Sequence, residues 1–226
     1  MTRTEHVKYY ALTILLPMIL MAGATFGVGK LILALPTGEA AVSRSLAADR
    51  TSLWNALTDV GSSLSDTPYI VAATAIFAII FRLVYKRWRE SVFLIAAVWS
   101  QSLVFLATTM IVGRHRPPVR HLDEAPPTSS FPSGHVSAAV AFYCGVALIL
   151  STHVRNRGLQ VVIWVLGIAA PLAVGFSRVY RGMHFVTDVL WGLLLGVGCV
   201  VMAARAILYR RERQRRRRAS ELVHPA

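Results

Sequence analysis

Six apolar stretches, each close to the length of a membrane-spanning helix, constrain the fold of this chain most strongly. They run approximately over Tyr9–Gly29, Thr67–Tyr85, Ser91–Val112, Ser133–Ser151, Leu159–Phe176 and Phe185–Tyr209. A helix needs roughly 20 apolar residues to cross a bilayer, and it satisfies its own backbone hydrogen bonds there. With 55% hydrophobic residues among 226, the chain is also too apolar for an ordinary soluble domain. We therefore predict an all-α, polytopic membrane protein: six transmembrane helices in a single domain over residues 1–226.

The basic residues are distributed unequally among the connecting segments. If the N-terminus is cytoplasmic, the cytoplasmic segments hold 16 of the 24 Lys and Arg residues but only four of the 11 Asp and Glu residues. The positive-inside rule then predicts a multi-pass protein of the cell membrane with both termini in the cytoplasm. Residues 210–226, which include RRERQRRRR, form a basic cytoplasmic tail that attracts anionic lipid. No nucleic-acid-binding fold precedes this tail, so we expect no nucleic-acid partner.

The first extracytoplasmic loop, between residues 31 and 66, contains an amphipathic pattern. Its apolar residues recur at helical spacing: Val42, Leu46, Leu53, Trp54 and Leu57. This pattern predicts an amphipathic interfacial helix that lies on the outer membrane surface and is anchored by Trp54.

Three polar segments fall on the same, extracytoplasmic, side of this topology. They are GRHRPP at 113–118, SSFPSGH at 129–135 and SRVYRGMHFVTD at 177–188. Ionisable side chains at membrane depth are costly, so such residues mark a site or lie in water. The candidate site residues are Arg114, Arg116, Ser133, Gly134, His135, Arg178, His184 and Asp188.

His184 and Asp188 are four residues apart, which would place both side chains on one face of a helix. A carboxylate that accepts a hydrogen bond from one imidazole nitrogen leaves the lone pair of the other nitrogen free. Such a histidine is a candidate nucleophile or base. An interfacial histidine next to a helix-start aspartate has the same spacing, so the pair alone does not decide between the two interpretations.

Arg116 and Arg178 stand at the ends of apolar segments, where each alone could simply extend its charge into water. Together with the turn at Ser133–His135 they suggest a socket for a tetrahedral anion, because guanidinium groups pair with two oxygens. Ser133 and backbone N–H groups near Gly134 would donate at the helix start, and Gly134 would allow close approach. His135 could protonate a leaving oxygen.

The residues Arg116–Pro117, Pro132–His135 and the run from Ser177 to Asp188 resemble the three-part signature of the type-2 phosphatidic acid phosphatase superfamily. The signature region covers 109–188, and the six-span layout is similar over nearly the whole chain. The resemblance implies a metal-independent membrane phosphatase without a cofactor, acting on lipid phosphates or diphosphates. It also implies that His184 becomes a phosphohistidine, that Asp188 orients it and that His135 protonates the leaving lipid oxygen.

The same resemblance implies that Arg116, Arg178, Ser133 and Gly134 hold the phosphoryl oxygens. One position departs from the pattern, because Thr109 stands where the family usually has a lysine. We expect Arg114 to supply the missing charge.

Polyprenyl diphosphate, phosphatidylglycerol phosphate and phosphatidic acid are all compatible substrates, with a slight preference for the first, because the family releases carrier-lipid diphosphates on this side of the membrane. The alternatives are an anion- or lipid-binding transporter and a non-catalytic family member. The oligomeric state is not predicted.

Overall fold

The structure, a computed structural model, describes residues 3–35 and 37–209. Every regular element over these residues is a helix. Six helical segments are long and apolar enough to cross a membrane: Thr4–Ala34, Thr67–Tyr85, Arg89–Val112, Gly134–His153, Arg157–Tyr180 and Val186–Leu208. They coincide with the six apolar stretches, which confirms the predicted all-α, polytopic fold. The predicted basic tail at 210–226 lies outside the described residues.

Two of the six spans are built from consecutive helices joined by a π-helical turn. The first consists of α1 (Arg3–Tyr10), the turn Ala11–Leu15 and α2 (Leu16–Ala34). The fourth consists of α7 (Gly134–Ala139), the turn Val140–Cys144 and α8 (Gly145–His153). The other spans are α5 (Thr67–Tyr85), α6 (Arg89–Val112), α9 (Arg157–Tyr180) and α10 (Val186–Ala203), which ends in the π-helical turn Ala204–Leu208.

Local sequence explains where several of these helices begin and end. Pro68 lies in the first turn of α5, where its missing N–H has no intrahelical partner to lose. The Asn156 side chain caps α9 by accepting a hydrogen bond from the Leu159 N–H at 3.0 Å. Gly113, at φ 71°, ends α6 in the left-handed conformation that favours glycine. The segment that carries Arg114 and Arg116 therefore leaves the bundle abruptly at this point.

Helix α6 lies at the centre of the bundle and packs against α2, α5 and α10. Its residues Phe93 and Leu94 are fully buried, in a cluster that also contains Phe142 and Ala203. The outward faces of the spans carry exposed apolar side chains such as Ile79 and Leu166, as expected for helices that face lipid.

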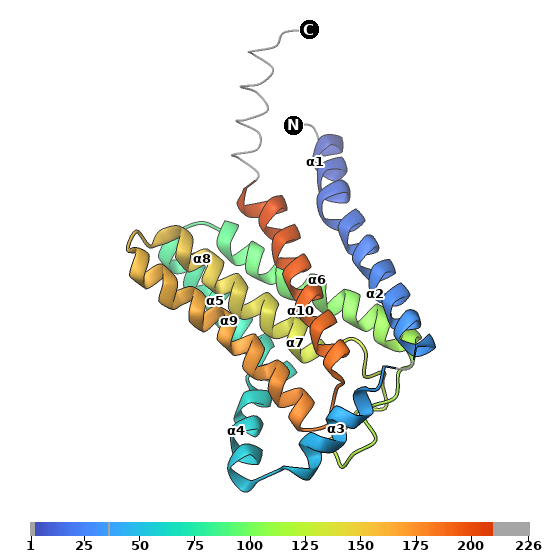
Figure 1. Cartoon of the computed structure of the whole chain (residues 1–226). Helices are drawn as coiled ribbons and strands as arrows, with labels where there is room; N and C mark the ends of the chain where they lie inside the picture. Colours follow the sequence, from blue (N-terminus) through green and yellow to red (C-terminus); the bar gives the residue numbers. More distant parts are fainter. Residues whose placement is uncertain (1–2, 36, 210–226) are drawn as a thin grey trace.

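The amphipathic pattern in the first loop forms two helices rather than the single helix that we predicted. They are α3 (Glu39–Ala48) and α4 (Ser52–Ser63), and Figure 1 shows both at one end of the bundle. The chain breaks between them because the Thr51 hydroxyl caps α4 by accepting the Trp54 N–H at 3.2 Å. Trp54 packs against α9, with its ring centroid 5.6 Å from that of Phe176.

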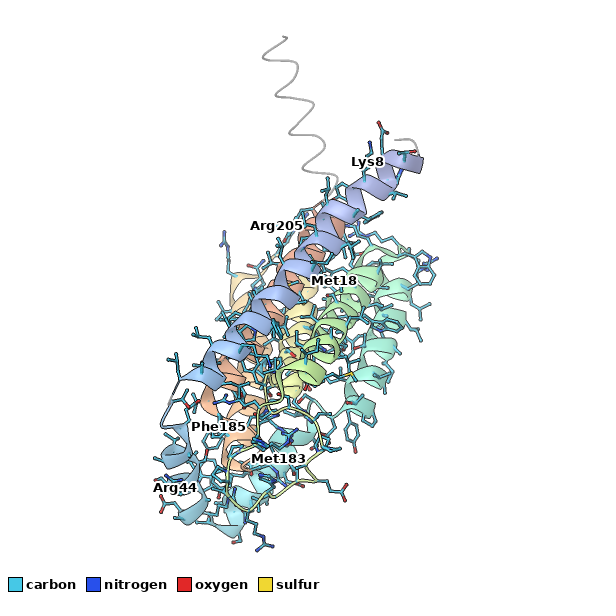
Figure 2. All side chains as sticks on the ribbon, turned by 90° about the vertical axis from the view of Figure 1, so that its right-hand side faces the viewer. Lys8, Met18, Arg44, Met183, Phe185 and Arg205 are labelled. Atoms are coloured by element: carbon cyan, nitrogen blue, oxygen red, sulfur yellow. The ribbon has the colours of Figure 1, made fainter. Side chains whose placement is uncertain are left out.

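The two ends of the bundle differ in the residues and loop helices that lie there. Figure 2 shows Lys8 and Arg205 towards one end, and Arg44, Met183 and Phe185 towards the other. The second end also holds α3 and α4 (Figure 1), and the three polar segments of the sequence meet there.

Candidate active site

A cavity of about 1000 Å³ brings the three polar segments together at this end of the bundle. Its walls come from α4, α5, α6, the segment between α6 and α7, the start of α7, the end of α9 and the segment between α9 and α10. Five of the eight residues singled out in the sequence line it: Arg116, Gly134, His135, Arg178 and His184. Ser133, Arg114 and Asp188 are not among the lining residues.

His184 is buried and lies just before α10, not within it. Its Nδ1 is 2.7 Å from the backbone oxygen of Ser130. A carbonyl oxygen only accepts hydrogen bonds, so Nδ1 carries the proton and the Nε2 lone pair is free. Burial lowers the pKa of His184, although the Asp188 carboxylate opposes this shift. Burial therefore favours the neutral imidazole, which is the form a nucleophile requires.

His184 and Asp188 lie close together as expected, but they do not pair along one face of a helix. Because α10 begins at Val186, the two residues do not share a helical face, and Asp188 Oδ2 is 3.8 Å from His184 Nδ1. Asp188 Oδ2 instead accepts the Phe185 N–H at 2.9 Å, and Oδ1 accepts a hydrogen bond from Arg114. The Ser130 carbonyl, which the sequence did not indicate, makes the hydrogen bond that fixes the imidazole.

Arg114 lies away from the cavity, and the structure contradicts its expected role in binding phosphate. Its guanidinium contacts the Asp188 carboxylate, donates to Glu39 Oε2 at 2.8 Å and donates to Thr187 Oγ1 at 2.8 Å. Only 7% of its surface is exposed. These partners compensate the buried charge of Arg114, so it is not available as the cation that Thr109 fails to supply.

Glu39, at the start of α3, is the second carboxylate of this buried network. Burial alone would raise the pKa of Glu39, but hydrogen bonds from the Thr187 backbone N–H and from Arg114 outweigh it and keep the pKa below its ordinary value. The Thr187 N–H lies 2.7 Å from Glu39 Oε1. The network therefore joins α3 to the start of α10, next to His184.

Arg116 and Arg178 both line the cavity. Arg116 Nη1 donates to the Met183 carbonyl at 2.7 Å, and Arg178 Nη1 donates to Asp123 Oδ2 at 2.8 Å. The Nε atom of each is buried without a hydrogen-bond partner among the described residues. Unpaired buried donors are costly, and the positive charges of these two guanidinium groups on the cavity wall would attract an anion.

Ser133 and Gly134 stand at the start of α7. The Ser133 hydroxyl is buried and has no hydrogen-bond partner among the described residues. A Cβ at position 134 would lie 2.8 Å from Phe105 Cζ. The aromatic ring thus explains the glycine by packing, whereas the sequence suggested close approach of a ligand.

His135 forms a pair that the sequence did not indicate. Its Nε2 is 3.1 Å from Oδ1 of Asp66, which lies 69 positions earlier in the chain. Thr109 also lines the cavity, and its hydroxyl donates to the Ser129 carbonyl at 3.2 Å. The position that the family usually gives to lysine therefore supplies neither charge nor a free donor.

The cavity continues from this polar region between α5 and α6. The walls there are apolar and include Ile70, Val71, Val98 and Trp99. Val71 and Trp99 also have exposed fractions of 60% and 66%, so this part of the wall reaches the outer face of the bundle. A ligand with a polar head and an apolar tail matches this division.

Four residues of the site were not predicted from the sequence: Glu39, Asp66, Asp123 and Ser130. Each meets its partner across a large separation in the chain, and Ser130 acts through its backbone. The sequence contains little indication of a site role for Asp66, because an aspartate before Thr67–Pro68 is typical of an ordinary helix start.

The PAP2 superfamily is the family whose model matches this chain, over residues 116–212. Over 70 residues, 30% of this chain and 34% of the relative, the sequence is 46% identical to phosphatidylglycerophosphatase B of Bacillus subtilis (strain 168). Over 79 residues, 35% and 34% of the two chains, it is 37% identical to the undecaprenyl-diphosphatase of Sulfolobus acidocaldarius. The matched segments thus span about a third of the length of these curated relatives.

Solved structures share the fold over a larger part of the chain. The crystal structure of a transmembrane PAP2 type phosphatidylglycerolphosphate phosphatase from Bacillus subtilis aligns with a TM-score of 0.70 and 23% identity, covering 86% of this chain and 94% of that one. The crystal structure of Aquifex aeolicus LpxE aligns with a TM-score of 0.57 and 23% identity, covering 73% and 93%. These similarities establish the arrangement of the helices.

Proposed function

We propose that the chain is an integral-membrane phosphatase acting on a lipid phosphate or diphosphate, because residues 116–212 match the model of the PAP2 superfamily. One observation supports the proposal above all. A single cavity holds His184, His135, Arg116 and Arg178 at its polar end and extends between the apolar faces of α5 and α6. The phosphoryl group would bind at the arginines while the lipid tail stays between the helices.

We propose that the reaction proceeds in two steps through a phosphohistidine. In the first step, His184 Nε2 forms a bond to phosphorus and the bond from phosphorus to the lipid oxygen breaks. That oxygen takes a proton from His135, because an alkoxide leaves poorly. In the second step, water attacks phosphorus, His135 recovers a proton from it, and the bond to His184 breaks to release phosphate.

The other predicted residues support these steps. Arg116, Arg178 and Gly134 line the cavity, and in this proposal the two guanidinium groups and the backbone at Gly134 hold the phosphoryl oxygens. The Ser133 hydroxyl does not line the cavity and would have to turn towards it to add a donor. In this proposal Asp188 acts on His184 through its charge at 3.8 Å, since the hydrogen bond to Nδ1 comes from Ser130. A negative charge at that distance would stabilise the imidazolium-like phosphohistidine.

The substrate class remains a lipid phosphate or diphosphate. Phosphatidylglycerol phosphate, phosphatidic acid and a polyprenyl diphosphate all combine a phosphoryl group with an apolar tail, as the cavity requires. We propose that both termini lie in the cytoplasm and that the site faces the extracytoplasmic side. The distribution of basic residues supports this orientation.

Phosphate release by purified protein tests the proposal. Protein in detergent with short-chain phosphatidic acid and excess chelator is expected to release inorganic phosphate, and His184→Ala is expected to release none. His115→Ala is the matched control, because His115 is exposed and does not line the cavity. Substrate binding without phosphate release by the unmutated protein would favour the transporter or non-catalytic alternatives.

A further inference from the structure

Asp66 lies outside both the matched family segment and the three-part signature, yet it lines the same cavity as His184. It joins α4 to α5 at the helix-start position of α5. An aspartate at this position normally accepts a hydrogen bond from a backbone N–H of the first turn. The Asp66 side chain makes no such bond. A purely structural capping role therefore does not explain the residue.

The Asp66 carboxylate instead contacts His135, with Oδ1 3.1 Å from Nε2. A carboxylate at this distance accepts a hydrogen bond from the Nε2–H group. Nδ1 is then the nitrogen left for the substrate. The pair is partly open to the cavity, with side-chain exposed fractions of 27% for His135 and 41% for Asp66.

The charges around His135 explain why a carboxylate is needed there. Arg116 and Arg178 line the same cavity, and their positive charges would repel a proton on His135. Asp66 supplies the opposite charge. Burial raises the pKa of Asp66, while Arg178 opposes and Asp123 and Asp59 reinforce this shift.

We propose that Asp66 is a positioning residue for the leaving-group acid: it holds the Nε2–H of His135 and so aims the protonated Nδ1 at the departing oxygen. This proposal rests on the proposed phosphatase function. As the bond from phosphorus to oxygen breaks, its electron pair goes to the oxygen, which takes the proton from Nδ1. His135 is left neutral, with Nε2–H still bound to an ionised Asp66. Asp66 itself touches neither phosphorus nor the leaving oxygen.

If Asp66 has this role, the effect of its replacement on kcat should depend on the leaving group of the substrate. Replacement of another carboxylate of the cavity wall should show no such dependence. An alkyl phosphate needs protonation of its oxygen, whereas p-nitrophenyl phosphate releases a stable anion unaided. General acids contribute about 10²–10⁴-fold to rate, and loss of a positioning partner removes part of that. Asp66→Asn is expected to lower kcat for short-chain phosphatidic acid about 10–100-fold, with kcat for p-nitrophenyl phosphate within about threefold of wild type. KM should change little for either substrate.

Two further variants sharpen this test. Glu124→Gln is the matched control, because Glu124 lines the same cavity and makes no hydrogen bond to His135 among the described residues. It is expected to leave the ratio of the two kcat values unchanged. Asp66→Glu keeps a carboxylate, so its ratio of alkyl to aryl turnover should lie between those of wild type and Asp66→Asn. Turnover of p-nitrophenyl phosphate by each variant shows that it is folded.

The outcomes separate this proposal from the proposed function. If wild-type protein hydrolyses neither substrate, the phosphatase function itself fails. If wild type hydrolyses both and Asp66→Asn lowers both equally, only the positioning role of Asp66 is overturned. A ratio for Asp66→Glu below that for Asp66→Asn would also contradict the role, because the carboxylate would then be of no benefit.

Discussion

At the scale of single residues, the protonation of His184 decides when the site can react. Burial lowers the pKa of His184 below 6.5, its ordinary value. A group with a lowered pKa keeps its neutral form to more acidic pH, so the nucleophile persists below the usual histidine range. We expect kcat/KM for p-nitrophenyl phosphate to stay level as pH falls through 6.5. A profile already halved at pH 6.5 by loss of a single neutral group would contradict this assignment.

Two explanations for the glycine at position 134 are packing against Phe105 and close approach of the substrate, and one pair of variants separates them. A Cβ at this position would lie 2.8 Å from Phe105 Cζ, so Gly134→Ala is expected to cost about 1–3 kcal/mol of stability through overpacking. Adding Phe105→Leu should restore both thermal stability and turnover, because it removes the ring atoms that clash. If stability returns and activity does not, the glycine serves close approach of the substrate instead.

The site residues that the sequence predicted belong to short local motifs. Those that it did not predict form hydrogen bonds with residues far away in the chain. His184, His135, Arg116 and Arg178 carry recognisable motifs, so their types and spacing suggested chemistry. Asp66 and Glu39 gain their meaning only from partners 69 and 75 positions away. That pairing depends on how α3 and α4 fold back over the bundle, which no local pattern specifies.

At the scale of helices, the spans were predictable because length and apolarity alone determine what crosses a bilayer. The loop helices were harder. The pattern from Val42 to Leu57 kept its helical spacing across a break at Asp49–Thr51, so it suggested one helix where the structure has α3 and α4. The break matters, since it allows α4 to pack along α9 while Glu39 of α3 reaches Arg114.

Arg114 joins α3 to α10 through Glu39 and Asp188. Its replacement is therefore expected to lower stability rather than to weaken phosphate binding. Arg114→Ala leaves Glu39 and Asp188 buried without their cation, which typically costs about 3–5 kcal/mol. We expect a lower melting temperature in detergent and a fall in kcat, with little change in KM. Arg120→Ala is the control, because Arg120 is exposed. Wild-type melting and turnover in Arg114→Ala would refute the network's importance.

At the scale of the whole molecule, the two ends of the bundle should lie on opposite sides of the membrane. Asp49 lies between α3 and α4, and Arg155 lies between α8 and α9; both are exposed. In a variant with Cys144 and Cys199 replaced by alanine, a membrane-impermeant thiol reagent should label Asp49→Cys on intact cells. Arg155→Cys should be labelled only after permeabilisation. The reverse pattern would place the cavity in the cytoplasm.

Trapping of a phosphorylated enzyme tests the central claim most directly, since everything at the site converges on attack by His184 Nε2 on phosphorus. Wild-type protein mixed with a lipid phosphate carrying a radioactive terminal phosphoryl group, then quenched rapidly in alkali, is predicted to carry base-stable, acid-labile label on His184. His184→Ala should carry none. Turnover by wild type with no label at His184, under a quench that preserves phosphohistidine, would contradict covalent catalysis by this residue.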